Sequence, residues 1–189
     1  MMNGLKVRPV IGVMGSAEEV LDSNDAGRSI SLAELLGKTI ADRDCVLVTG
    51  ATTGIPNLVS QVARSHGALT IGISPAASSK EHTLDYLLPV DAAEVIIYTG
   101  FGLKGRNVIN VRSADIVIIF GGGIGTLNEF TIAYDEGKII GVLEGTGGVA
   151  DRVESLVSLS SKRDPSKIIF DSNPESLIEK CLSALADRN

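Results

Sequence analysis

The stretch Ile116–Glu129, IVIIFGGGIGTLNE, places five large apolar residues directly before a glycine-rich turn and the start of a helical pattern. A continuous apolar run of this length is typical of a strand that helices cover on both faces of a parallel sheet. Glycines let the backbone approach a ligand closely, and the following helix points its free N–H groups and positive dipole end at the turn. The stretch therefore predicts an α/β fold that binds an anion, most simply a phosphate, at this turn.

Six further short apolar runs, rich in Val and Ile, lie on either side of this stretch. They are Val10–Met14, Val46–Thr49, Thr70–Ile73, Val95–Tyr98, Ile139–Leu143 and Ile168–Phe170. Segments with helical spacing of apolar residues separate them. This alternation predicts a single doubly wound, Rossmann-like, mostly parallel sheet of about seven strands with helices on both faces. No linker composition divides the chain, so we expect residues 1–189 to form one nucleotide-binding domain.

Composition excludes several classes of function. The chain has 17 Lys and Arg against 23 Asp and Glu, a net charge of −6, and no basic run, which argues against nucleic-acid binding. Cys45 and Cys181 have no metal or redox spacing and are interpreted as small buried apolar residues. The apolar run Val10–Met14 is too short for a signal peptide or a membrane span. We therefore expect a cytoplasmic protein that contacts no membrane and needs no metal.

Small residues follow several of the predicted strands, where a doubly wound sheet binds its ligand. Candidate ligand-binding residues are Gly15, Ser16, Gly50, Gly54, Gly122, Gly123, Gly125 and Thr126, and Gly100-Phe101-Gly102 follows the fourth strand. Ser16 could instead cap the following helix. The lysine of a P-loop is absent from GGGIGT, which disfavours ATP hydrolysis by that machinery. NAD binding is a weaker alternative, because the dinucleotide fingerprint normally follows the first strand.

Each of three polar residues near the turn has two possible interpretations. Thr126 and Glu129 have the spacing of a capping box and could simply satisfy the first N–H groups of their helix. A carboxylate beside an anion-binding turn is equally well placed to act on a sugar or a water. Arg106 is either a solvated surface cation or a guanidinium that reaches into the crevice, where it suits a phosphate.

The stretch Gly105–Glu129, GRNVINVRSADIVIIFGGGIGTLNE, resembles the LOG-like proteins, often labelled "possible lysine decarboxylase". That family contains cytokinin riboside 5′-monophosphate phosphoribohydrolases and, in a branch that looks closer to this chain, molybdenum cofactor carrier proteins. Its signature is an Arg-bearing helix, then A-D, a strand and PGGxGTxxE. Arg106 falls at the family's catalytic Arg, and Gly122 to Glu129 fall on GGxGTxxE.

The resemblance implies hydrolysis of the N-glycosidic bond of a nucleoside 5′-monophosphate. Glu129 would stabilise the oxocarbenium or activate water, and Arg106 would hold ribose hydroxyls or phosphate. The resemblance also implies that no cofactor is required and that the chain forms a homodimer or a higher homo-oligomer. Gly121 replaces the signature's Pro, and Asn107 replaces the hydrolases' usual Lys. These departures keep the alternative open: a non-catalytic carrier or sensor of a phosphorylated cofactor such as molybdenum cofactor.

Four further expectations concern the remaining segments and side chains. The stretch Ser74–Asp91 lacks clear periodicity and is either a lid over the crevice or a surface loop. Asn173-Pro174 is expected to open the last helix, with Ser172 and Glu175 as its capping box. His66 and His82 have no partner spacing and are interpreted as surface residues. No lysine is singled out as the Schiff-base residue that a pyridoxal-phosphate decarboxylase needs.

Overall fold

A seven-stranded sheet forms the centre of the computed structural model, which describes residues 7–17, 26–159 and 167–188. Every pair of neighbouring strands is parallel. The strands are β1 (Val10–Gly15), β2 (Val46–Thr49), β3 (Thr70–Ser74), β4 (Val95–Tyr98), β5 (Ile116–Phe120), β6 (Ile139–Leu143) and β7 (Lys167–Asp171). The seven predicted strands are therefore confirmed, and three of them extend by one or two residues beyond their predicted ends.

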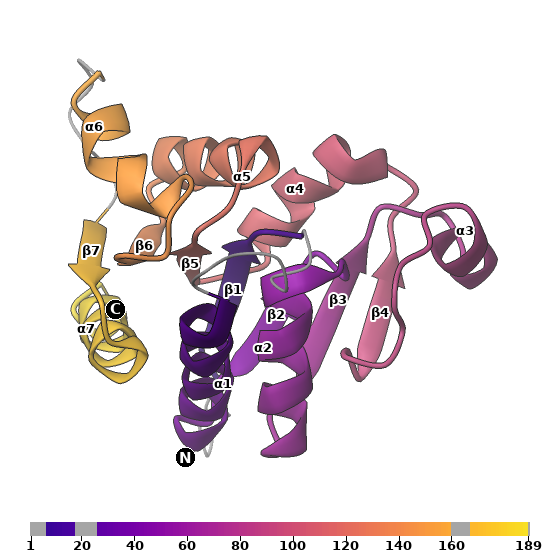
Figure 1. Ribbon diagram of the computed structural model, residues 1–189, viewed down its shortest axis with the longest axis horizontal. Helices are drawn as coiled ribbons and strands as arrows, with labels where there is room; N and C mark the ends of the chain where they lie inside the picture. The colour runs from indigo at the N-terminus through magenta and orange to yellow at the C-terminus, as the bar shows by residue number, and fades with distance from the viewer. Residues whose placement is uncertain (1–6, 18–25, 160–166, 189) are drawn as a thin grey trace, which may run out of the picture.

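Helices cover both faces of the sheet, as the sequence predicts (Figure 1). One layer contains α1 (Ala26–Asp42), α2 (Gly54–Ser65) and α7 (Pro174–Ala186). The other contains α4 (Gly102–Arg112), α5 (Ile124–Asp135), the 3-10 helix η2 (Ala150–Arg152) and α6 (Val153–Val157). The short helix α3 (Ser79–Leu84) lies beside the edge strand β4. In the described part of the chain, no helix has the length and hydropathy that a membrane span needs.

The strand order β4-β3-β2-β1-β5-β6-β7 determines where a ligand can bind. From β1 the chain adds strands in one direction as far as β4 and then returns to place β5 against the other side of β1. At the ends of these two strands, Gly15 is the register partner of Phe120. The turns after β1 and β5 therefore diverge to opposite faces, which opens a crevice at the carboxyl edge of the sheet.

The central strands are apolar along their whole length because both of their faces are covered. Every residue of β5 and β6 is buried, whereas Val95 and Ile97 of the edge strand β4 are about half exposed. Cys45 and Cys181 are free thiols in the core on the α1–α2–α7 side, as predicted. Continuous apolar strands of this kind are expected where helices exclude water from both sides.

Two local expectations are wrong. The N-cap of α7 is Asn173 rather than Ser172: its side chain accepts a hydrogen bond from the Ser176 N–H at 2.9 Å. His82 is fully buried, because α3 forms within the Ser74–Asp91 segment and turns the ring inward. Its Nδ1 lies 2.8 Å from Ser74 Oγ and its Nε2 lies 3.0 Å from the Pro89 carbonyl. With both ring nitrogens paired, the imidazole can lie in the interior.

Candidate functional site

A crevice of about 630 Å³ lies at the carboxyl edge of the sheet, where β1 and β5 separate. Its walls come from the ends of β1, β2, β5 and β6 and from the first turns of α4 and α5. Of the predicted site residues, the following line it: Gly15, Ser16, Gly50, Arg106, Gly122, Gly123, Gly125, Thr126 and Glu129. A volume of this size suits a small-molecule ligand.

The remaining predicted turns contribute less than expected. Gly54 begins α2 with φ +73° and does not line the crevice. Gly100 and Gly102 are also outside it, because they follow β4, which lies three strands away from β1 at the edge of the sheet. Glycine in these turns permits positive φ values and has no contact with the crevice.

The turn between β5 and α5 is shaped by its glycines. Gly121 and Gly122 have φ values of +58° and +89°, and a Cβ on Gly122 would lie 2.2 Å from Thr126 Oγ1. The N-cap is Gly123, which supplies no side-chain hydrogen bond, and α5 begins at Ile124. The first N–H groups of a helix have no partner within it, so those of α5 face the crevice with a partial positive charge. This arrangement suits an anionic ligand group.

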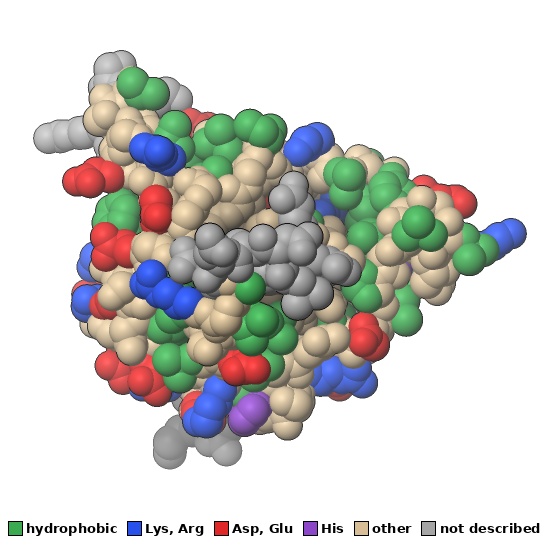
Figure 2. Space-filling model, viewed as in Figure 1, with side chains coloured by type: hydrophobic (Ala, Val, Ile, Leu, Met, Phe, Trp, Pro, Cys, Tyr) green, Lys and Arg blue, Asp and Glu red, His purple; other side chains and the backbone are tan. Residues whose placement is uncertain are grey.

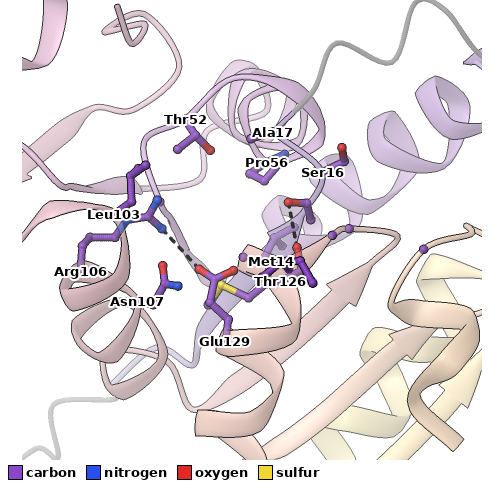
Figure 3. Close-up of a pocket in the computed structure, with 18 of the residues that line it drawn as sticks. Met14, Ser16, Ala17, Thr52, Pro56, Leu103, Arg106, Asn107, Thr126 and Glu129 are labelled. Atoms are coloured by element: carbon purple, nitrogen blue, oxygen red, sulfur yellow. Dashed lines mark hydrogen bonds and ion pairs between the residues drawn. The ribbon is translucent and has the colours of Figure 1, made fainter. Parts of the chain in front are cut away.

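The capping-box interpretation of Thr126 and Glu129 is wrong. Helix α5 starts two residues before Thr126, so neither side chain is positioned at the cap. The Thr126 hydroxyl instead donates to the Gly15 carbonyl at 3.2 Å and ties the start of α5 to the end of β1 (Figure 3). Neither side chain caps the helix, and both line the crevice.

Glu129 is a buried carboxylate with a defined orientation, 7% exposed. Its Oε1 accepts a hydrogen bond from Arg106 Nη1 at 3.3 Å (Figure 3) and a second one from Asn110 Nδ2 at 3.2 Å. Burial raises the pKa of the Glu129 carboxyl, and the nearby Arg106 guanidinium opposes that rise. Both donors bind one oxygen, so the other oxygen, Oε2, is left to meet a ligand.

Arg106 is also buried, which excludes its interpretation as a solvated surface cation. It is 6% exposed, and its guanidinium lies against the backbone of Gly50, where a Cβ would be 2.0 Å from Nη1. Burial lowers the pKa of Arg106, and the carboxylate of Glu129 opposes that shift. Its Nε is buried and finds no hydrogen-bond partner among the described residues. Charge neutralisation by Glu129 is what allows the guanidinium to lie in the interior.

Sequence analysis missed the contribution of the turn after β6. Thr146 and Gly148 line the crevice, and Thr146 Oγ1 accepts a hydrogen bond from the Gly121 N–H at 2.9 Å. A Cβ on Gly148 would lie 2.2 Å from the Gly122 carbonyl oxygen, so this turn packs directly on the β5–α5 turn. The run Glu144-Gly-Thr-Gly-Gly was the available signal, because it follows a predicted strand in the same way as the other glycine-rich turns.

Asn110, on α4, is a second functional candidate to which sequence analysis gave no role. It is fully buried, donates to Glu129 and to the Met14 sulfur at 3.1 Å, and leaves its own Oδ1 without a partner. Asn107, one turn earlier, lines the crevice and donates to Asn128 Oδ1 at 2.8 Å. Across residues 7–17, 26–159 and 167–188, no cluster of three or more His, Cys, Asp or Glu side chains could hold a metal.

Comparison with known proteins identifies the family to which this chain belongs. The SLOG cluster4 family profile (LDcluster4) matches residues 8–178, and the chain belongs to this family. An uncharacterised protein of Archaeoglobus fulgidus is 34% identical over 134 residues, 71% of this chain and 79% of that protein. A cytokinin riboside 5′-monophosphate phosphoribohydrolase of Mycobacterium marinum is 32% identical over 111 residues, 58% of this chain. That match spans 56% of the enzyme's length.

Solved structures share the fold over nearly the whole chain. The molybdenum cofactor binding protein of Rippkaea orientalis is 32% identical with a TM-score of 0.75, covering 95% of this chain and 99% of that one. The molybdenum cofactor carrier protein of Chlamydomonas reinhardtii is 26% identical with a TM-score of 0.73 over the same shares. DNA processing protein A of Streptococcus pneumoniae, at 18% identity and a TM-score of 0.61 over 62% of its length, shares the fold alone.

Proposed function

We propose that this protein binds a nucleoside 5′-monophosphate in the crevice and hydrolyses its N-glycosidic bond. The observation that carries the proposal is the orientation of Glu129. Two donors bind its Oε1, and the side chain lies within a crevice whose wall includes the N-terminus of α5. A carboxylate with one oriented oxygen beside an anion site is what this reaction needs. The phosphoribohydrolase of Mycobacterium marinum supports the reaction class.

In this mechanism the phosphate binds the N–H groups at the start of α5, and the ribose then extends toward Glu129. The bond between C1′ and the base nitrogen breaks, and positive charge develops on the ribose. The ionised Glu129 carboxylate stabilises that charge and accepts a proton from the attacking water, whose oxygen bonds to C1′. The departing base takes up a proton from the solvent, and Glu129 releases the proton it accepted from water to the solvent, which restores the carboxylate. Arg106 orients Glu129 throughout, and no cofactor takes part.

The second candidate is a carrier of a phosphorylated cofactor such as molybdenum cofactor. It is supported by the cofactor-binding protein of Rippkaea orientalis, at 32% identity over nearly all of both chains. Asn107 favours it as well, since the hydrolases that the sequence resembles have Lys at this position and the Asn107 amide is bonded to Asn128. In a carrier the same crevice would bind the phosphorylated cofactor and break none of its bonds.

Release of free base separates the two candidates. Purified protein is incubated with AMP, GMP, CMP and UMP, and the base is quantified by chromatography. Hydrolysis is expected for at least one of them, with Glu129→Gln lowering the rate by about 10²–10⁴-fold. Glu136→Gln, at the C-cap of the same helix and paired with Arg112 at the surface, is the matched control and should retain the wild-type rate. Nucleotide binding by calorimetry without any base release would reject the hydrolase and favour the carrier.

We also propose how the protein is organised and where it acts. Residues 1–189 form one domain, and the protein is cytoplasmic and binds no nucleic acid. It assembles as a homodimer or a higher homo-oligomer. Figure 2 shows apolar side chains gathered over the α3 and α4 side of the molecule. Beside the crevice, Phe101 is 67% exposed, Leu103 49% and Ile124 76%. A second copy that covered these residues would also cover part of the crevice. Light scattering at micromolar concentration tests this, and a monomeric mass would count against it.

A further inference from the structure

We propose that Lys104 is the residue that makes the crevice prefer phosphorylated over unphosphorylated ligands, a role that no charged side chain deeper in the crevice can fill. The inference rests on the proposed function, since it concerns the same ligand. In this proposal Lys104, at the mouth of the crevice, neutralises the charge of the phosphate, and Arg106 positions Glu129.

Lys104 lies on the first turn of α4 and lines the crevice. Its Nζ is 3.7 Å from the position that a Cβ would take at Gly125, so the ammonium group lies over the first turn of α5. That turn carries the N–H groups without helical partners. Among the described residues, Lys104 makes no hydrogen bond or ion pair, and its side chain is exposed. An ammonium at this place can contact an anion that the α5 N–H groups also hold.

The charges that line the crevice are few. Among the residues that the structure describes, they are Lys104, Arg106 and Glu129, in a chain whose net charge is −6. Arg106 and Glu129 form an ion pair at 3.3 Å with both side chains nearly buried, so their charges cancel within the wall. Lys104 therefore supplies the net positive charge of the crevice. Of the described charged side chains at the crevice, Lys104 is thus the one left to attract a phosphate, together with the partial positive charge at the start of α5.

Arg106 is unsuited to the phosphate for a geometric reason. Its guanidinium is packed on the Gly50 backbone and bonded to Glu129, and turning it toward α5 would leave a buried carboxylate without its cation. Such a rearrangement is costly in the interior of a protein. Among the described residues, the buried Nε of Arg106 has no hydrogen-bond partner, so part of this guanidinium is already unsatisfied in its present position.

The test compares AMP with adenosine, which differ only in the phosphate. Calorimetry at about 0.05 M salt gives the affinity ratio of AMP to adenosine for the wild-type protein and for Lys104→Met, Lys104→Arg and Lys80→Met. Lys80 is an exposed lysine on α3 outside the crevice, so its variant removes the same charge elsewhere. We expect Lys104→Met to lower the ratio by about 10-fold or more, because a charge-assisted contact is lost. Adenosine affinity, Lys104→Arg and Lys80→Met should stay close to wild type.

The outcomes separate the inference from the function on which it rests. The same titration with GMP, CMP and UMP covers the other bases, and a wild-type protein that binds none of the four monophosphates would overturn the proposed function, and this inference with it. A wild-type preference for AMP that survives in Lys104→Met would overturn the inference alone and leave the phosphate to the backbone. An equal loss in Lys80→Met would also overturn it, because it would show a general charge effect. Thermal unfolding of each variant, expected to match wild type, shows that the fold is intact.

Discussion

The two helix layers of this protein bury different kinds of residue. In the α1–α2–α7 layer, the buried helical residues are almost all apolar or small, such as Leu36, Val59 and Ile178. In the α4–α5 layer, the buried helical residues include Arg106, Asn107, Asn110, Thr126 and Glu129. One layer stabilises the sheet by excluding water from apolar surface. The other surrounds a group of polar side chains that contribute little to a core and face a crevice.

This difference indicates where stability and function are located. Buried charged pairs are weak evidence for stability, since desolvation can exceed the Coulombic gain. A layer that keeps an Arg–Glu pair, two buried asparagines and two unpartnered polar atoms has a use for them other than packing. We therefore expect substitutions in the α1–α2–α7 layer to change the free energy of unfolding, and substitutions in the α4–α5 layer to change ligand chemistry.

The largest expected effect is on stability, in the apolar layer. Leu36→Ala removes a fully buried side chain from α1 and should lower the free energy of unfolding by about 2–5 kcal/mol. Glu34→Ala, an exposed position on the same helix, should change it by less than about 0.5 kcal/mol. Urea unfolding measures both. A large loss of AMP affinity in the folded Leu36→Ala variant would contradict the separation of the two layers.

The second effect concerns the Arg106–Glu129 pair. In Gly50→Ala the new methyl group would occupy the space of the guanidinium, since a Cβ there would be 2.0 Å from Arg106 Nη1. We expect the guanidinium to move away from Glu129 and base release to fall by about 10²-fold, as small misplacements in active sites do. Gly27→Ala on α1, where a Cβ meets nothing within 4 Å, is the matched control. A wild-type rate in Gly50→Ala would show that the pair is dispensable.

A smaller effect distinguishes two possible caps of α7. Asn173→Ala removes the acceptor of the Ser176 N–H and should lower the free energy of unfolding by about 1 kcal/mol. Ser172→Ala should have almost no effect, because Asn173 holds the N-cap position. Thermal unfolding of the two variants, side by side, gives the difference. A larger loss of stability in Ser172→Ala than in Asn173→Ala would support the capping box that the sequence predicts.

The smallest effects are those of pH, and their signs should differ between the layers. Three donors from Asn173, Ser176 and Lys180 lower the pKa of Asp171 to about 2. Its contribution to stability is therefore present above its ordinary value of 3.8 and is lost as pH falls toward 2. Burial raises the pKa of Glu129, so between its ordinary 4.5 and that raised value stability falls as pH rises.

Unfolding of wild type, Asp171→Asn and Glu129→Gln across pH 2–8 tests these signs. Relative to wild type, Asp171→Asn should lose stability as pH rises from 2 toward 4. Glu129→Gln should gain stability relative to wild type as pH rises above 4.5, because its neutral side chain has no proton to lose. Curves that are parallel to wild type at all pH values would show that neither carboxyl changes its pKa on folding.

Sequence patterns alone determined the parallel sheet and its glycine-rich turns. Runs such as Ile116–Phe120 and Ile139–Leu143 predict buried strands of a parallel sheet, because continuous apolar strands need helices on both faces. The same reasoning located the crevice at the turn after β5, because ligands of doubly wound sheets lie at the carboxyl ends of the strands. These features depend on local composition and on chain order, which a sequence records directly.

Only the tertiary structure decided which side chains meet. Arg106 and Glu129 are 23 residues apart, and their pairing at 3.3 Å follows from the contact between α4 and α5. Helix α5 begins two residues before Thr126, so the Thr126 hydroxyl donates to the Gly15 carbonyl instead of capping the helix. His82 could be buried only once Ser74 and the Pro89 carbonyl satisfied both of its nitrogens. Hydrogen bonds between distant residues depend on side-chain geometry, which local periodicity does not specify.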